Sequence, residues 1–283
     1  MSKIGDFKAE LLFYQFYFER FTKNSLSLIN KTSIWKKLNT NPIVELLKKD
    51  SFALGITLPN NLVKEIREFA IKMPCYGNGI TNLGFYYPDK TQAEKKHGKS
   101  FLSGKYYNTA SFCPAIKKLE SDPSLLAIAA EYLQAEPLHQ GNQLSWTFPT
   151  ESTIYERRRK TQMFYYNSDN CRLLKFSFYI TDVDLCSSPD VCVKGSHIKK
   201  KLSHLLLRKR GCSYQEIVGF YGYKNIVPIC GKAGLGFVKD TLCFHNGTPP
   251  SSKECLKLEI KFAAKDYGMP NDLREASQLE CIL

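Results

Sequence analysis

The fold is decided by TQMFYYNSDNCRLLKFSFYITDVD (residues 161–184) together with DTLCFHNGTPPSSKECLKLEIKF (residues 240–262). Apolar and polar residues alternate in both stretches, and successive side chains of a β-strand point to opposite faces. The expected apolar faces consist of Leu174, Phe176, Phe178 and Ile180, and of Leu256, Leu258, Ile260 and Phe262. The expected polar faces consist of Lys175, Ser177, Tyr179 and Thr181, and of Cys255, Lys257, Glu259 and Lys261. We expect the apolar faces to pack on helices and the polar faces to line a barrel lumen that can hold a small molecule.

Three segments, LLKFSFYITDVD (173–184), SPDVCVKGSH (188–197) and GKAGLGFVKDTLCFHNGTPPSS (231–252), resemble the phytanoyl-CoA dioxygenase-like (PhyH) family of the Fe(II)/2-oxoglutarate-dependent oxygenases. The resemblance extends over about residues 120–265. It implies a mainly β protein with flanking helices, folded as a double-stranded β-helix, which is a jelly-roll or cupin-like barrel. It also implies that a His-x-Asp pair and a distant His bind iron, and that a basic residue binds the carboxylate of 2-oxoglutarate.

The resemblance places His245, in the sequence HNGTPP, at the distant metal-ligand position. Counting back from Lys175, it places Tyr165 and Asn167 at the positions of the His-x-Asp pair, and Cys255 at the position of the basic residue. No histidine lies between His139 and His197, so no shift of alignment supplies the missing imidazole. A bulge could bring Asp169 inward, but His plus one carboxylate is a weak Fe(II) site. Fe(II) and 2-oxoglutarate are therefore expected of the family but not of this chain, whose cofactor stays unknown.

Five side chains are predicted to act on, or bind, a substrate in the lumen. Lys175 or Lys257 would bind a carboxylate in place of the missing basic residue; the alternative is an internal Lys257–Glu259 pair with water. A lumen tyrosine beside a cationic lysine can transfer protons, so Tyr165 and Lys175 are the catalytic candidates, although a packing role for Tyr165 is favoured. The predicted substrate-binding residues are Lys175, Lys257, Tyr179 and Trp146.

The cysteines suggest a second kind of site. His245, Cys243 and Cys255 could form a recast site for zinc or copper, since these are soft ligands. Buried cysteines that fill small spaces are the preferred interpretation. His197, in the GSH turn, is expected to hold its loop by hydrogen bonds.

The composition describes a basic protein of one domain. The 283 residues are 43% hydrophobic and carry a net charge of +13, with clusters at 157–160, 199–201 and 208–210. Solvated loop charge is the preferred explanation, followed by steering of an anionic substrate; nucleic acid is unlikely because no recognition motif accompanies the charge. The ten Cys include no CxxC, so reduced thiols and a cytoplasmic location are expected. No apolar run reaches about 18 residues, so no membrane partner is expected.

The chain is expected to form a single domain over 1–283. Residues 1–135 would be helices and loops that pack on and cover the barrel, 136–265 the barrel core, and 266–283 a loosely ordered tail. Helices are expected at 10–21, 43–49, 62–70, after Asp122-Pro123, and at 202–210. The Gly-rich segment 74–112 would be a loop over the barrel mouth, with lid candidates Tyr86, Tyr87, His97, Tyr106 and Tyr107.

The predicted function is that of a diverged family member, which binds or modifies a small, anionic organic molecule in the lumen without the standard iron site, as a biosynthetic enzyme that is either non-oxidative or uses an altered metal. One alternative is a pseudoenzyme that serves as a binding or regulatory subunit of an active oxygenase, which would be its protein partner. Another is an active hydroxylase with unusual ligands. The residues leave all three open, and they do not identify the substrate.

Overall fold

The computed structural model describes residues 32–149, 163–167, 172–202, 204, 211–247, 249–268 and 271–282. The helix expected at 10–21, the basic clusters at 157–160 and 208–210, Asp169, and most of the helix expected at 202–210 lie outside the described residues.

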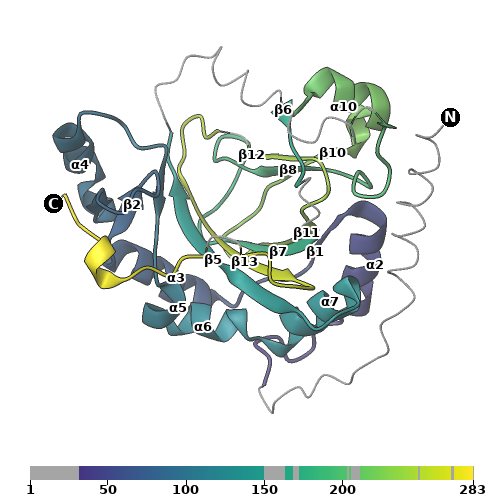
Figure 1. Ribbon diagram of the computed structural model, residues 1–283, viewed down its shortest axis with the longest axis horizontal. Helices are drawn as coiled ribbons and strands as arrows, with labels where there is room; N and C mark the ends of the chain where they lie inside the picture. Colours follow the sequence, from purple (N-terminus) through teal and green to yellow (C-terminus); the bar gives the residue numbers. More distant parts are fainter. Residues whose placement is uncertain are drawn as a thin grey trace.

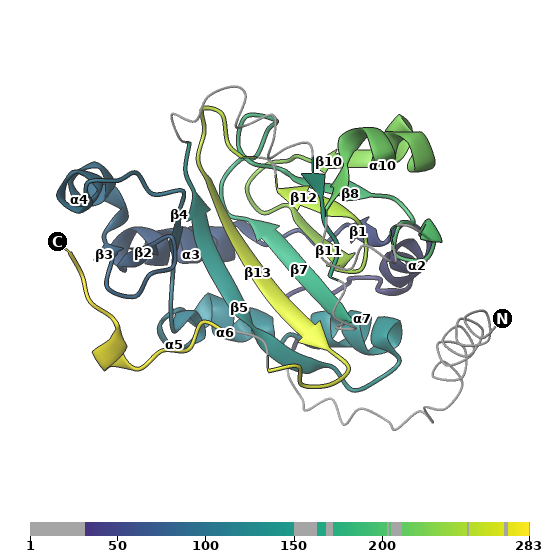
Figure 2. The same ribbon diagram turned by 45° about the horizontal axis from the view of Figure 1, so that its top comes forward.

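An eight-stranded antiparallel sheet forms the main wall of the barrel (Figure 1). Its strand order is β1-β11-β7-β13-β5-β4-β2-β3. The strands are β1 (Phe52–Leu54), β11 (Gly236–Asp240), β7 (Leu173–Tyr179), β13 (Cys255–Ala263), β5 (Leu138–Thr147), β4 (Ser103–Lys105), β2 (Cys75–Gly77) and β3 (Gly84–Phe85). The long strands β5, β13 and β7 lie side by side at its centre (Figure 2).

A second wall of shorter strands faces the main sheet. It contains β10 (Ile226–Ile229), β8 (Asp190–Val193) and β12 (His245–Gly247), with the pair β6 (Met163–Phe164) and β9 (Cys212–Ser213) beside them. A bridge between Tyr165 and His245 connects the pair to β12. From β5 to β13 the chain passes back and forth between the two walls, which confirms the predicted double-stranded β-helix.

Helices cover the outer face of the main sheet, as the alternation of residues predicted (Figure 1). They are α2 (Asn41–Asp50), α3 (Asn60–Lys72), α6 (Pro114–Glu120) and α7 (Pro123–Leu133). Leu174, Phe176 and Phe178 share one core cluster with the buried residues of these helices. The helix predicted after Asp122-Pro123 is confirmed: the Asp122 carboxylate accepts a hydrogen bond from the backbone N–H of Ser124 at 2.8 Å, which is an N-cap.

Residues 74–112 differ from the loop that the sequence predicted. They form β2, β3 and β4, the 3-10 turn η1 (Tyr87–Asp89), and helices α4 (Lys90–His97) and α5 (Thr109–Phe112), and they extend the main sheet beyond β5. Glycine makes this packing possible: a Cβ on Gly77 would lie 2.4 Å from the ring of Phe101. The segment therefore lengthens one wall of the barrel.

The C-terminal segment is docked where a loosely ordered tail was expected. The backbone N–H groups of Glu280 and Ile282 donate to Thr81 and Gly84, and Gly84 donates back to Glu280. Nearer the start of this segment, the Asn108 side chain forms hydrogen bonds with both the backbone N–H and the carbonyl of Arg274. The segment, which contains the 3-10 turn η3 (Ala276–Gln278), thus adds hydrogen bonds to the free edge of β3.

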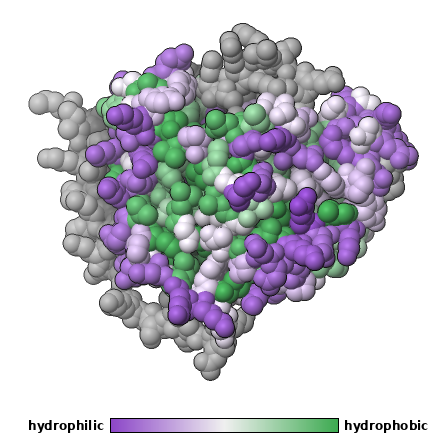
Figure 3. Space-filling model, turned by 180° about the vertical axis from the view of Figure 1, so that it is seen from behind, coloured by the Kyte–Doolittle hydropathy of each residue, from purple (hydrophilic) through white to green (hydrophobic). Residues whose placement is uncertain are grey.

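A smaller unit inserted between β8 and β10 carries helix α10 (Tyr214–Tyr221) and the 3-10 turn η2 (Tyr223–Asn225). The helix begins with a capping box between Ser213 and Glu216. Seen from behind, hydrophobic residues occupy much of the middle of the molecule, and hydrophilic residues dominate the right-hand side of that view (Figure 3). In the described ranges, no helix has the length and apolar content needed to cross a bilayer.

We predict that Gly236→Ala destabilises the fold by about 1–3 kcal/mol or more, because overpacking a tight interior forces strain. A Cβ on Gly236 would lie 1.9 Å from the carbonyl oxygen of Ile56 and 2.6 Å from the ring of Phe178. Urea unfolding measures the loss. Gly219→Ala on α10 is the matched control, since its Cβ would meet nothing within 4 Å; equal stability of the two variants would contradict the packing described here.

Candidate functional site in the barrel lumen

A chain of five charged side chains occupies the lumen. On β13, Lys257 lies 3.2 Å from Glu259 and 2.7 Å from Asp190 of β8. Lys239 of β11 lies 2.6 Å from the other Asp190 oxygen, and Lys175 of β7 lies 3.2 Å from Glu259. Asp190 belongs to the second wall and its lysine partners to the main sheet, so these ion pairs join the two walls across the lumen.

Mutual attraction keeps both carboxylates ionised despite their burial. Burial alone would raise the pKa of Asp190, but Lys239 and Lys257 hold it well below its usual range. Glu259 behaves in the same way, since its lysine neighbours lower its pKa against the effect of burial. Burial lowers the pKa values of Lys239 and Lys257, but the two carboxylates raise them by more, so both pKa values are raised overall.

Lys175 is the exception among the lumen lysines. Burial lowers its pKa, and the attraction of Glu259 does not restore it because Lys239, Lys257 and Lys261 add repulsion. Lys261 lies opposite Lys175 in the strand register. Cations therefore outnumber anions on this face of the lumen, and Lys175 is the lysine whose charge is least compensated.

Ser177, two residues along the same face of β7, adds a second unsatisfied group. Its side chain is fully buried, and its hydroxyl has no hydrogen-bond partner in the part of the chain that the structure describes. A buried polar group without a partner is costly and commonly marks a place for water or a ligand. Lys175 and Ser177 together offer an ammonium and a hydroxyl donor to such a group.

His245, Tyr165 and Asn167 lie together at the rim of the lumen. The backbones of Tyr165 and His245 exchange two hydrogen bonds, and the Asn167 N–H donates to the carbonyl of Thr241. The Thr241 N–H donates in turn to the carbonyl of Leu173. The Nδ1 of His245 lies 2.9 Å from the carbonyl oxygen of Cys243, which can only accept, so Nδ1 carries the proton and Nε2 keeps its lone pair.

Two of the other predicted site residues, Tyr179 and Trp146, lie on opposite faces of the main sheet. Tyr179 lines the lumen, but its hydroxyl is already engaged, donating to the carbonyl of Ile229 and accepting from the N–H of Asp190. Trp146 lies on the opposite face of the main sheet, where it stacks on Tyr87 at 4.2 Å within the helix-covered core. The expectation that Trp146 contacts a lumen substrate does not agree with this orientation. Tyr165 is half exposed, and no hydrogen bond joins it to Lys175 in the described residues.

The cysteines pack in the lumen end near His245. Cys192, Cys243 and Cys255 are buried in one small apolar cluster with Tyr179 and other residues. Cys192 lies directly opposite His245 in the strand register. Hydrogen bonding to Cys192, against the effect of burial, lowers the pKa of the Cys243 thiol, with a smaller contribution from His245.

The neighbours of His245 on the adjoining strand are Tyr165, which forms a β-bridge with it, and Asn167, two residues further along. Nowhere in the described ranges do three His, Cys, Asp or Glu side chains lie close enough to share a metal ion. The recast site of His245, Cys243 and Cys255 therefore finds no support in this geometry.

A partly buried lysine holds the backbone that leads to His245. Lys200 donates to the carbonyl oxygens of Ser196 and, at 2.6 Å, Leu242, and its ammonium lies 4.5 Å from the ring centre of Tyr166. The Ser196 hydroxyl also accepts from the N–H of Phe244 at 2.8 Å. Burial lowers the pKa of Lys200 to about 8. The view that the 199–201 cluster is solvated charge is thus wrong for its middle residue.

His197 agrees with its predicted structural role. Its Nε2 lies 3.1 Å from the carbonyl oxygen of Lys48 on α2, so the ring connects the GSH turn to the helix layer.

Sequence reasoning missed two central residues, Lys239 and Asp190. The alternation in GFVKD (236–240) places Lys239 on the same face as Phe237, which was a usable signal. Asp190 follows a proline at the start of a short strand, and nothing local indicates that its partners lie on β11 and β13.

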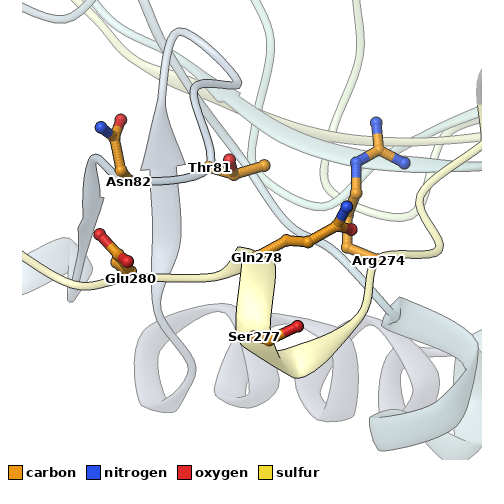
Figure 4. Close-up of a pocket in the computed structure, with 6 residues that line it drawn as sticks. All are labelled: Thr81, Asn82, Arg274, Ser277, Gln278 and Glu280. Atoms are coloured by element: carbon orange, nitrogen blue, oxygen red, sulfur yellow. The ribbon is translucent and has the colours of Figure 1, made fainter.

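A separate surface pocket lies between the turn after β2 and the C-terminal segment (Figure 4). It measures about 550 Å³ and is open to solvent. The residues that line it all have polar side chains: Thr81, Asn82, Arg274, Ser277, Gln278 and Glu280. None of the lumen residues contributes to it, so it is distinct from the candidate site.

The architecture defines the class as a double-stranded β-helix with an outer helix layer, and solved structures share it. HygX from Streptomyces hygroscopicus, solved with nickel and 2-oxoglutarate, aligns with 87% of this chain and 95% of its own at 11% identity and a TM-score of 0.56. The non-heme α-ketoglutarate-dependent carbocyclase SnoK from nogalamycin biosynthesis aligns over 84% and 88% at 13% identity and a TM-score of 0.56. AviO1 from Streptomyces viridochromogenes Tue57 aligns over 83% and 98% at 14% identity and a TM-score of 0.53.

At these identities the likeness shows the fold alone. No family model matches the sequence, and no curated protein matches it either. The assignment to the phytanoyl-CoA dioxygenase-like branch therefore stays a prediction.

We predict that Asp190→Asn lowers the free energy of unfolding by about 3–5 kcal/mol, because it leaves two buried ammonium groups without a full counter-charge. Urea unfolding at neutral pH measures the loss. Glu45→Gln is the control, since Glu45 is an exposed residue on α2 whose carboxylate is paired with Lys48 at 2.9 Å, and it should leave stability nearly unchanged. Similar results for the two variants would show that the lumen ion pairs do not support the barrel.

We predict that the stability of the protein relative to Lys200→Met rises as the pH increases from about 8 towards 10.5. The folded state holds the Lys200 proton less tightly than the unfolded state does, so in this window unfolding takes up a proton and higher pH favours the fold. Urea unfolding across the window, with the exposed Lys201→Met as control, measures the difference. A flat difference would mean that Lys200 is solvated.

Proposed function

We propose that the protein is a diverged member of the 2-oxoglutarate oxygenase fold that binds a small organic anion in its lumen and does not use the standard Fe(II)/2-oxoglutarate site. The observation that carries the proposal is the surplus of positive charge in the lumen, centred on Lys175. A buried cation whose partners do not fully compensate it is stabilised by an added anion.

The neighbouring groups define what the ligand must offer. A carboxylate suits the Lys175 ammonium and the unsatisfied hydroxyl of Ser177, because both are donors. Lys257 contributes less to binding a carboxylate, because Asp190 and Glu259 already form ion pairs with its ammonium. The charged lumen is flanked by the apolar cluster around Cys192, so an anion with a small apolar part fits the lumen as a whole.

Any catalysis in this proposal would be non-oxidative, and Tyr165 is the candidate acid or base. Its position at the rim beside His245 supports contact with a ligand that enters the lumen. A non-catalytic protein that only binds the ligand, as a regulatory subunit, would use the same pocket. Tyr165→Phe distinguishes the two, since it would remove turnover and leave binding unchanged.

We predict that Lys175→Met weakens binding of small carboxylates at least tenfold, as expected for the loss of one charge-assisted interaction. Calorimetric titration with pyruvate, succinate, 2-oxoglutarate and citrate measures this, after thermal unfolding has selected the anions that stabilise the protein. Lys232→Met is the control, because Lys232 is exposed and paired with Asp182. Binding should also weaken with rising pH, since the lowered pKa of Lys175 makes it lose its charge early. Unchanged binding by Lys175→Met would refute the proposal.

One observation favours a second candidate, an active hydroxylase with unusual ligands. The tautomer of His245 leaves the Nε2 lone pair available, as metal-binding histidines require. Metal analysis after loading with Fe(II), combined with an assay for succinate release from 2-oxoglutarate, separates the candidates. Stoichiometric iron and succinate release that His245→Ala abolishes would establish the hydroxylase and remove the first proposal.

A further inference from the structure

Four large apolar side chains gather on the unit that carries α10, outside the lumen. Ile198, Leu202, Phe220 and Tyr223 are 66%, 55%, 48% and 70% exposed. We call these residues, with the exposed Lys199, Lys201 and Lys224, the α10 patch.

The two segments that form the α10 patch pack against each other. The Tyr221 hydroxyl donates to the carbonyl of Lys199 at 2.6 Å, and the ring of His204 lies 5.7 Å from that of Phe220. The N–H of Lys194 donates to the carbonyl of Asn225 at 2.8 Å. These contacts place residues 198–202 beside the C-terminal end of α10, so the apolar and basic side chains belong to one region.

The region protrudes from the rest of the molecule. Helix α10 lies at the outer edge of the fold in both ribbon views, on the side away from α3, α6 and the C-terminus (Figures 1 and 2). A protruding surface fits a flat or soft partner better than one that must insert a side chain into a pocket.

Charge in this part of the chain has one sign. Residues 194–225 contain eight Lys and Arg residues and a single acidic residue, Glu216. The carboxylate of Glu216 already serves in the capping box of α10, where it accepts from the N–H of Ser213 at 2.7 Å. The patch therefore presents lysines with little opposing charge, and the function proposed above does not account for them.

Apolar tips interspersed with lysines match the surface of an anionic lipid bilayer. Lysines are drawn to the negative headgroups, and aliphatic and aromatic side chains enter the boundary between headgroups and acyl chains. A nucleic acid would also attract the lysines, but Ile198 and Leu202 would gain nothing from contact with phosphates. The combination of both kinds of side chain favours the bilayer.

We propose that the α10 patch is a docking surface for anionic phospholipid membranes. This differs from the expectation of no membrane partner, which depended only on the lack of an apolar span. Docking of this kind is peripheral and reversible, and it needs no spanning helix. It is independent of what the lumen binds.

Co-sedimentation of the full chain with vesicles tests the proposal. The probes are vesicles of phosphatidylcholine alone and vesicles of phosphatidylcholine with phosphatidylserine. We expect at least tenfold tighter binding to the anionic vesicles, since each lysine near the surface contributes roughly fivefold. Added salt should weaken the binding.

Two double variants separate the contributions within the patch. Phe220→Ser/Tyr223→Ser and Lys199→Ser/Lys201→Ser should each reduce binding to anionic vesicles at least tenfold. The matched controls are Phe112→Ser, which removes an exposed aromatic residue on α5, and Lys64→Ser/Lys72→Ser on α3. They should bind as the wild type does, and thermal unfolding should show that all variants fold.

Three outcomes would overturn the proposal. Equal binding to neutral and anionic vesicles would show that charge plays no part, and patch variants that bind like the wild type would place the contact elsewhere. Tighter binding to duplex or single-stranded DNA than to anionic vesicles would identify the patch as a nucleic-acid surface instead.

Discussion

The Asp190 carboxylate, held between Lys239 and Lys257, is the interaction on which the barrel depends. Its two oxygens reach both lysines from the opposite wall, so a single carboxylate sets the distance between the walls. Tyr179 reinforces the same junction, because its hydroxyl joins β7 to the N–H of Asp190 and to β10. The geometry around Asp190 therefore determines both the width of the lumen and the positions of the charges within it.

A lumen of this kind is an unusual use of buried charge. Buried ion pairs often contribute less to stability than well-packed apolar residues of the same size, because desolvation offsets their attraction. Several lysines and two acids in one lumen make sense where a polar interior serves a ligand. Burial, and to a smaller extent repulsion from the other lysines, disfavours the charge on Lys175, and an incoming anion would offset both.

The sequence predicted those features that depend on neighbouring residues. The alternation in residues 173–180 and 255–262 identified which side chains face the helices, and Asp122-Pro123 marked the start of α7. Pairings between distant strands were not predictable, because no local pattern shows that Asp190 meets Lys239. The orientation of Trp146 was predictable, because Trp146 shares the apolar face of its strand with Leu144 and Phe148. The short strands of residues 75–105 were missed for a similar reason: each is too short to show alternation, and they form only by pairing with one another and, through β4, with the edge of β5.

The docked C-terminal segment has a consequence for the order of folding. Residues 280–282 pair with Gly84, so the edge of the sheet is completed by residues that are synthesised long after the strand they cover. Until then β3 exposes unpaired backbone groups, and contacts between residues so distant in sequence form slowly. During synthesis, the nascent chain would present an open strand edge on which chaperones or neighbouring chains could act.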